Sequence, residues 1–256
     1  MRAIPQSIAW WCFVPQHFAP EAFVRAVAEA GYAAIDLAPP EHCALVRAHG
    51  LAISALAGHG PLTHGLNRRA HHAEIEAQVR AALAVAQEYV VPNVLCFSGN
   101  RAGLDDAAGA AACAEGLARL APLAEAAGVT LALEVLNSKV DHPDYQADHT
   151  AWAAAVCERV ASPRVKVLDD LYHMQIMEGD LIRTLQTYAP LIAHYHTAGC
   201  PGRHELDETQ EINYHAVLRA IRATGYQGYV VHEFLPLGDP LAALRATVAR
   251  YAPDLA

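Results

Sequence analysis

Residues 165–196 read VKVLDDLYHMQIMEGDLIRTLQTYAPLIAHYH, and this stretch carries the pattern that decides the fold. It contains a short apolar run, Val165–Leu168, then a helical pattern near Asp180–Tyr188, and then a second apolar run, Ile192–Thr197. A strand followed by a helix and another strand is the unit that builds parallel sheets. The same alternation continues outward from this stretch in both directions along the chain.

The alternation predicts eight strand-then-helix units, which fit a closed (β/α)₈ barrel, or TIM barrel, better than an open sheet. Several expected helices end at a glycine, the usual left-handed stop, just before the next strand. A doubly wound sheet normally has a glycine-rich phosphate loop after its first strand, and none follows the first strand here. We therefore predict an α/β protein with a single TIM-barrel domain over residues 1–256. The expected strands are Ser7–Phe13, Ala34–Leu37, Ala52–Ala57, Val94–Phe97, Thr130–Leu136, Val165–Leu168, Ile192–Thr197 and Tyr229–Phe234, and the expected helices are Pro20–Ala30, Pro40–His49, His72–Tyr89, Asp105–Ala127, Thr150–Val160, Asp180–Tyr188, Asn213–Thr224 and Pro240–Tyr251.

Composition and charge restrict the partners that we expect. Apolar residues make up 54% of the 256 residues, yet no run approaches the roughly 18 to 20 apolar residues that a membrane span needs. The formal net charge of −9 disfavours non-specific binding to nucleic acid or to an anionic membrane. The N-terminus lacks the apolar segment and cleavage site of a signal peptide, so we expect a cytoplasmic location. The six cysteines form no CxxC pair and are expected to be buried, reduced thiols.

Each of the last four expected strands has a carboxylate or an imidazole at or near its end: Glu134, Asp170, His196 and Glu233. Strand ends at one rim form the active sites of TIM barrels, so these side chains are expected to converge. Asp169 is an alternative to Asp170 as the site residue of the sixth expected strand. Alternation along a strand points these two neighbouring side chains to opposite sides, so only one of them can face the site. Buried charges are costly unless they are paired or bind a metal. Three carboxylates with one imidazole suit one Mg²⁺ or Mn²⁺ ion.

Three segments in the second half of the chain carry family motifs. They are EVLNS at residues 134–138, YHMQIMEGD at residues 172–180, and PGRHE at residues 201–205 followed by QEINY. These segments resemble the hydroxypyruvate isomerases, which belong to the xylose isomerase-like barrel superfamily. The resemblance is strong from about residue 134 to residue 236, and it is weaker but colinear before that.

The resemblance implies roles for the residues at the strand ends. The resemblance implies that one divalent metal ion is bound by four ligands, Glu134, Asp170, His196 and Glu233. It selects Asp170 over Asp169, because the family's aspartate precedes a histidine by three residues, as Asp170 precedes His173. It also implies that Glu134 and Glu233 are the catalytic acid and base.

Five residues are expected to bind the substrate. The resemblance implies this role for His173 and Arg203, and Asn137 belongs to the strand-five motif. Arg203 offers a planar fork for a substrate carboxylate, and Lys139 offers a looser cation. His59 is a pocket candidate in the loop after the third strand. The loops after strands three and four depart from the family pattern, so the metal chemistry carries over better than the identity of the substrate.

The expected reaction interconverts a small hydroxy-keto acid and its aldehyde isomer, of the hydroxypyruvate and tartronate semialdehyde type. One carboxylate removes a proton next to a carbonyl, a metal stabilises the enediolate, and a second carboxylic acid returns a proton to the neighbouring carbon. The nearest alternative is a ketose 3-epimerase with the same metal and glutamate pair. A metal-dependent endonuclease would need more ligands and a basic groove, and a non-catalytic sugar-binding barrel would not need the glutamate pair. The expected partner is thus a small molecule, and a homo-oligomer is compatible with the sequence although no feature demands one.

Overall fold

The computed structural model describes residues 3–256, so the first two residues of the predicted domain lie outside the described residues. The strands are β1 (Gln6–Ala9), β2 (Ala34–Asp36), β3 (Ala52–Ile53), β4 (Ala55–Ala57), β5 (Asn93–Cys96), β6 (Thr130–Glu134), β7 (Val165–Asp170), β8 (Ile192–Thr197) and β9 (Val230–His232). The α-helices are α1 (Pro20–Ala30), α2 (Cys43–Ala48), α3 (His72–Tyr89), α4 (Asp106–Ala127), α5 (Thr150–Val160), α6 (Leu171–Met177), α7 (Leu181–Tyr188), α8 (Tyr214–Ala223) and α9 (Pro240–Leu255). Short 3₁₀ turns precede α2 and α3 and follow α7.

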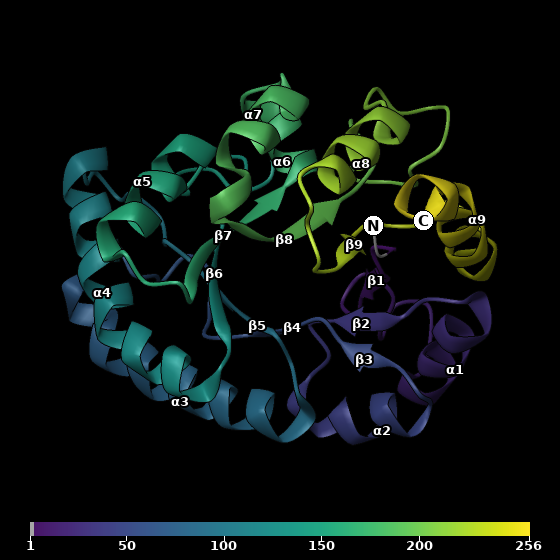
Figure 1. The fold of residues 1–256 in the computed structure, drawn as a ribbon, viewed down its shortest axis with the longest axis horizontal. Helices are drawn as coiled ribbons and strands as arrows, with labels where there is room; N and C mark the ends of the chain where they lie inside the picture. Colours follow the sequence, from purple (N-terminus) through teal and green to yellow (C-terminus); the bar gives the residue numbers. More distant parts are fainter. Residues whose placement is uncertain (1–2) are drawn as a thin grey trace.

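The strands form a ring that the helices surround (Figure 1). All paired strands are parallel, in the order β3-β2-β1-β9-β8-β7-β6-β5-β4. Apolar side chains of the helices, such as Val24 and Val27 of α1 and Leu244 of α9, are buried against this ring. The predicted TIM barrel is therefore confirmed.

The predicted third strand, Ala52–Ala57, is interrupted at Ser54, where the chain changes its pairing partner. β3 pairs with β2, whereas β4 pairs with β5. The Ser54 amide still donates to the Ile35 carbonyl at 3.1 Å, and the Leu37 amide donates to the Ala55 carbonyl at 3.0 Å. The ring closes at this point, so one apolar run supplies two short strands.

The ends of other predicted strands also differ from the observed ones by up to four residues, and β6 and β9 each end two residues earlier than predicted. The first strand ends at Ala9 and not at Phe13, because the amides of Phe13 and Val14 turn back to the Trp10 carbonyl. The strand after α5 extends to Asp170, two residues beyond the predicted end.

An additional helix, α6, follows β7 directly and breaks the predicted one-helix-per-strand alternation. The Asp170 side chain caps α6 by accepting from the amides of Tyr172 (2.9 Å) and His173 (3.2 Å). Capping of this kind satisfies amides that have no partner inside the helix. The same cap fixes the direction of the Asp170 carboxylate at the end of its strand.

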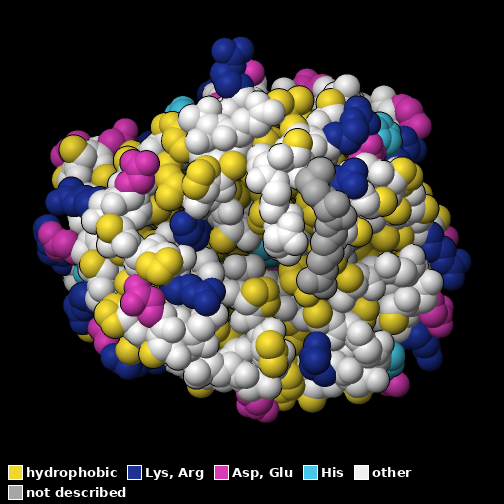
Figure 2. Space-filling model, in the orientation of Figure 1, with side chains coloured by type: hydrophobic (Ala, Val, Ile, Leu, Met, Phe, Trp, Pro, Cys, Tyr) yellow, Lys and Arg dark blue, Asp and Glu magenta, His cyan; other side chains and the backbone are white. Residues whose placement is uncertain are grey.

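The burial of the cysteines and the mixed charge of the surface agree with what the composition predicts. All six cysteines are free and buried, as predicted. On the face drawn in Figure 2, acidic and basic side chains are scattered among apolar ones and form no continuous patch of one sign. Within residues 3–256, no helix has both the length and the apolar character needed to cross a bilayer.

Candidate active site

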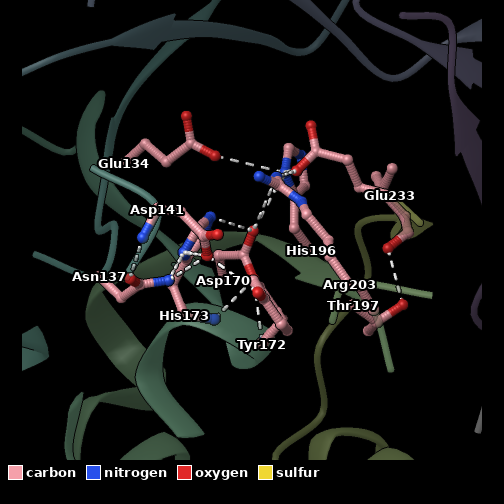
Figure 3. Close-up of polar contacts among 12 residues, drawn as sticks. Glu134, Asn137, Asp141, Asp170, Tyr172, His173, His196, Thr197, Arg203 and Glu233 are labelled. Atoms are coloured by element: carbon pink, nitrogen blue, oxygen red, sulfur yellow. Dashed lines mark hydrogen bonds and ion pairs between the residues drawn. The ribbon is translucent and has the colours of Figure 1, made fainter. Parts of the chain in front are cut away.

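Four side chains from neighbouring strands meet at the carboxyl ends of the strands. Glu134 ends β6, Asp170 ends β7, His196 lies in β8 and Glu233 directly follows β9. All four residues are buried, and each offers one ligand atom that lies within 4.8 Å of the others. The expected convergence is therefore present, as Figure 3 shows.

The His196 imidazole faces the carboxylates through its Nδ1 atom. This atom lies 3.2 Å from Glu233 Oε2, 3.4 Å from Glu134 Oε1 and 4.0 Å from Asp170 Oδ2. Burial alone would lower the pKa of His196, but Glu233 and the other carboxylates raise that pKa well above its ordinary value. The imidazole is thus held by negative charge on the side where a cation would bind.

Asp170, and not Asp169, joins this cluster. One oxygen of Asp170 caps α6, while Oδ2 faces His173 Nε2 at 3.6 Å and Arg203 Nη2 at 3.9 Å. Burial raises the pKa of Asp170 to about 7 against the opposing effect of Arg203. Alternation along β7 places Asp169 on the other face of the strand, where burial raises its pKa to about 8.

The two glutamates differ in their surroundings. Glu233 Oε1 accepts a hydrogen bond from Trp11 Nε1 at 2.7 Å, and Oε2 accepts from Arg203. Burial raises the pKa of Glu233, but His196 and Arg203 outweigh burial and bring the pKa well below its ordinary value. Glu134 contacts only His196 in this cluster, and burial raises its pKa.

Arg203 lies between two aromatic rings above the carboxylates. Its guanidinium carbon is 5.1 Å from the centre of the Trp11 ring and 5.6 Å from that of Tyr172. Cation–π contacts of this kind fix the plane of the guanidinium. The Nε atom is buried and makes no hydrogen bond within residues 3–256, which leaves a donor for a bound anion.

Asn137 determines which nitrogen of His173 carries the proton. The Asn137 Oδ1 atom accepts from the backbone amides of Val140 (3.0 Å) and Asp141 (2.9 Å), so the NH₂ group must be the atom on the other side. That group donates to His173 Nδ1 at 2.6 Å and to Asp141 Oδ2 at 2.6 Å. Neutral His173 therefore carries its proton on Nε2, the atom that faces Asp170. Burial lowers the pKa of His173 well below its ordinary value, which keeps the ring neutral.

Two predicted substrate-binding residues, Lys139 and His59, make their described hydrogen bonds outside the strand-end cluster. Lys139 is exposed, and its ammonium donates to the carbonyls of Ile176 (3.0 Å) and Met177 (3.1 Å) at the end of α6. His59 is buried in the loop after β4, where its Nε2 atom accepts from the Phe97 amide at 2.9 Å. Neither residue contacts the four strand-end side chains through a described hydrogen bond or ion pair.

Sequence reasoning missed Asp36, which lies behind the cluster. Asp36 ends β2 and is fully buried, and its Oδ2 atom lies 3.2 Å from His196 Nε2. The available signal was a carboxylate at the end of the short apolar run AAID, the same signal that marks Glu134.

The donor set fits a hard divalent cation. Mg²⁺ is bound by oxygen ligands at about 2.0–2.1 Å, so ligands on opposite sides of the ion are roughly 4.2 Å apart. The four ligand atoms lie within 4.8 Å of one another before any ion is considered. Three buried carboxylates so close together also repel one another unless positive charge lies between them.

The chain is similar to several known proteins. It is 38% identical over 130 residues to a putative hydroxypyruvate isomerase of Xenopus laevis, covering 51% of this chain and 47% of the relative. It is 31% identical over 173 residues to a hydroxypyruvate isomerase of Escherichia coli, covering 67% and 66%. The first of these matches thus spans about half the length of the relative. The crystal structure of an AP endonuclease, family 2, from Brucella melitensis superposes with a TM-score of 0.86 at 28% identity, covering 98% of this chain and 99% of that one.

A family model also matches most of the chain. Residues 24–250 match the model described as a xylose isomerase-like TIM barrel, which includes all four residues of the strand-end cluster. The match covers well over half of the chain and agrees with the ring of parallel strands. The chain therefore belongs to the xylose isomerase-like TIM barrel family.

Proposed function

We propose that this protein is a divalent-metal-dependent isomerase that interconverts a small hydroxy-keto acid and its aldehyde isomer, of the hydroxypyruvate and tartronate semialdehyde type. The observation that carries the proposal is the pair of buried glutamates, Glu134 and Glu233, on two sides of the His196 Nδ1 atom. The names of the two hydroxypyruvate isomerase relatives support the same reaction type.

The glutamates are proposed to move the protons. One carboxylate takes the proton from the carbon that bears the hydroxyl group, and the other delivers a proton to the former carbonyl carbon. The hydroxyl proton moves to the former carbonyl oxygen, so the reaction is balanced and needs no outside oxidant. In Figure 3 the nitrogen atoms of His196 and Arg203 lie between the two glutamate carboxylates, an arrangement that is compatible with one glutamate on either side of a bound substrate.

Arg203 and His173 are proposed to orient the substrate. The guanidinium of Arg203, fixed between Trp11 and Tyr172, offers a planar fork for the carboxylate of a keto acid. His173 offers a neutral Nε2–H group for a carbonyl or hydroxyl oxygen, and Asn137 holds it in that state. His173 and Asn137 are fully buried and the Arg203 side chain is 12% exposed, which limits the access of water to this side of the site.

The residues proposed to hold a Mg²⁺ or Mn²⁺ ion are those of the strand-end cluster, Glu134, Asp170, His196 and Glu233. When bound, such an ion supplies positive charge that stabilises negative charge developing on the substrate oxygens. The choice of Mg²⁺ or Mn²⁺ over Zn²⁺ follows from the excess of carboxylate ligands.

The test is turnover of the purified protein with Mg²⁺ or Mn²⁺ on a panel of three- to six-carbon keto acids and free ketoses. We expect turnover of hydroxypyruvate, and Glu134→Gln and Glu233→Gln should each reduce it by about 10²-fold or more. Epimerisation of ketoses with no turnover of hydroxypyruvate would refute the proposed reaction and support the epimerase alternative.

The binding role of Arg203 has a matched comparison in Lys139. Arg203→Gln should raise the KM for a keto acid by about tenfold to a hundredfold, because a hydrogen bond to a charged group contributes about 1.5–3 kcal/mol. Lys139→Gln removes the same charge from a residue that contacts the end of α6, and its KM should stay within about twofold of the unmodified protein. Equal effects of the two changes would contradict the proposed carboxylate site.

A further inference from the structure

A second buried polar group lies inside the ring, next to the strand-end cluster. We call it the Asp36 network, and it consists of Ser7, Asp36, Ser54, Asn93 and His194. Every one of its members is buried, and Asp36 and His194 are completely inaccessible. Burying so many polar groups is costly unless their hydrogen bonds are satisfied, so their arrangement calls for an explanation.

The hydrogen bonds of Asn93 fix the tautomer of His194. The Asn93 NH₂ group donates to the Ser54 carbonyl at 3.1 Å, which can only accept. The same group faces His194 Nδ1 at 3.4 Å, so that nitrogen accepts and the proton lies on Nε2. His194 Nε2 then donates to Asp36 Oδ1 at 3.0 Å.

A second donor acts on the same oxygen of Asp36. The Ser54 hydroxyl donates to Asp36 Oδ1 at 2.5 Å, which leaves Ser7 to donate to Ser54 at 2.8 Å. With Oδ1 held by both Ser54 and His194, the carboxylate cannot rotate freely. Its other oxygen, Oδ2, is thereby directed at His196 Nε2, 3.2 Å away.

We propose that Asp36 is a positioning residue, which keeps the Nε2 proton of His196 on the side away from the strand-end cluster and directs the Nδ1 lone pair at the bound cation. A ligating imidazole must have a free lone pair on the nitrogen that meets the metal, and a carboxylate on its other nitrogen fixes the ring and raises its basicity. Three carboxylates lie around His196 Nδ1 and attract a proton there, and Asp36 supplies the opposing negative charge at Nε2. This inference rests on the proposed cation site.

The same atoms admit a competing interpretation. Asp36, His194 and His196 also lie close enough together to hold an ion of their own. The His194 Nε2–H group already donates to Asp36 Oδ1, and Asp36 Oδ2 and His196 Nε2 face each other at 3.2 Å with no other hydrogen-bond partner among the described residues, so the arrangement is explained without an ion. A second ion would in addition require His196 to bridge two cations through its two nitrogens.

The experiment measures Mn²⁺ binding to the intact protein by calorimetry, together with pulsed EPR of the bound Mn²⁺ to detect directly coordinated nitrogen. We expect one Mn²⁺ per chain and a nitrogen coupling in the unmodified protein. Asp36→Asn replaces the carboxylate that accepts from Ser54 and His194 with a neutral amide. This change should weaken Mn²⁺ binding by about 10- to 100-fold and reduce the nitrogen coupling. Gln6→Met is the control, because it removes buried hydrogen bonds to Val248 and His232 in the same ring without touching Asp36 or His196, and it should leave both readouts unchanged.

The possible results separate the inference from the proposed function. An unchanged Mn²⁺ affinity and nitrogen coupling in Asp36→Asn overturns the inference, and so does a stoichiometry of two ions that falls to one in this variant. Should Asp36→Asn fail to fold, Ser54→Ala removes one of the two donors that hold Asp36, and it should weaken Mn²⁺ binding in the same direction to a smaller extent. Unmodified protein that binds Mn²⁺ but does not turn over hydroxypyruvate refutes the proposed reaction and leaves the role of Asp36 standing, whereas unmodified protein that binds no Mn²⁺ refutes both.

Discussion

Replacing each of the two buried glutamates with glutamine should affect the stability of the metal-free protein to different extents. The two changes are chemically identical, and both residues lie at strand ends beside His196. Glu233, however, accepts hydrogen bonds from Trp11 and Arg203, whereas the one described ion-pair contact of the Glu134 carboxylate is with His196, at 3.4 Å. Glu233→Gln should therefore destabilise the fold clearly, and Glu134→Gln should not.

The magnitude follows from the lost contacts. A glutamine at position 233 has one oxygen and one NH₂ group, so its NH₂ group must face either Trp11 Nε1–H or the N–H donor of Arg203. At least one hydrogen bond to a charged group is lost, which costs about 1.5–3 kcal/mol. For a chain of this size, 1 kcal/mol corresponds to a change in Tm of about 2–4 °C, so the Tm should fall by about 3–12 °C. Glu134→Gln replaces a carboxylate whose pKa burial already raises, so the loss should stay below about 1 kcal/mol.

The assay is thermal unfolding followed by circular dichroism in the presence of EDTA, with both variants at the same pH and ionic strength. Binding to a metal then plays no part in the comparison, and the result does not depend on the substrate. A Glu134→Gln protein that loses as much Tm as the Glu233→Gln protein would refute the assignment of the hydrogen bonds.

Three further predictions concern the cation, His173 and pH. Mn²⁺ at a hundred times its Kd should stabilise the EDTA-treated protein by about 2.7 kcal/mol, which corresponds to a rise in Tm of about 5–11 °C. An equal rise in Tm with K⁺ at the same ionic strength would contradict a specific metal site. Asn137→Leu removes the donor to His173 Nδ1, so kcat/KM should fall about tenfold while Mn²⁺ affinity is retained, and a loss of Mn²⁺ affinity instead would place Asn137 in metal binding. Burial lowers the pKa of His59 from 6.5 to about 4, so the unfolded chain binds more protons between these values and the free energy of unfolding falls by up to about 3 kcal/mol as the pH drops from 6.5 to 4. Denaturant titrations across this range should show a shallower loss in His59→Gln, and an identical slope would refute the buried neutral state of His59.

Much of the fold was predictable because its signals are local. Apolar runs bounded by polar residues and glycines identify most of the strands and helices within a few residues. The interruption at Ser54 was not predictable in this way, because residues 52–57 form one uninterrupted pattern and the change of pairing partner depends on β2 and β5. Helix α6 was missed since it depends on a cap from Asp170, a residue that the sequence marks only as a candidate ligand.

The cluster was predictable for a geometric reason, and its supporting residues were not. Parallel strands bring their carboxyl ends to one rim, so charged residues at successive strand ends must meet whatever the helices do. The contact between Asp36 and His196 joins residues 160 positions apart, and no local pattern announces it. The contacts of the Lys139 ammonium with the carbonyls at the end of α6 were likewise not predictable, because they depend on a helix that the sequence pattern does not indicate.

The placement of the cluster beside the last strand, β9, has a consequence for how the protein is made. The strand β9 contributes three residues, pairs with β1 on one side and with β8 on the other, and is followed at once by Glu233, whose amide donates to the Thr197 carbonyl. An ion bound by the proposed ligands would join β6, β7 and β8 to Glu233, so it would bind fully only after the final strand has docked. A nascent chain still lacking residue 233 would have an incomplete ligand set, so ion binding would stabilise the protein only once the last step of assembly is complete.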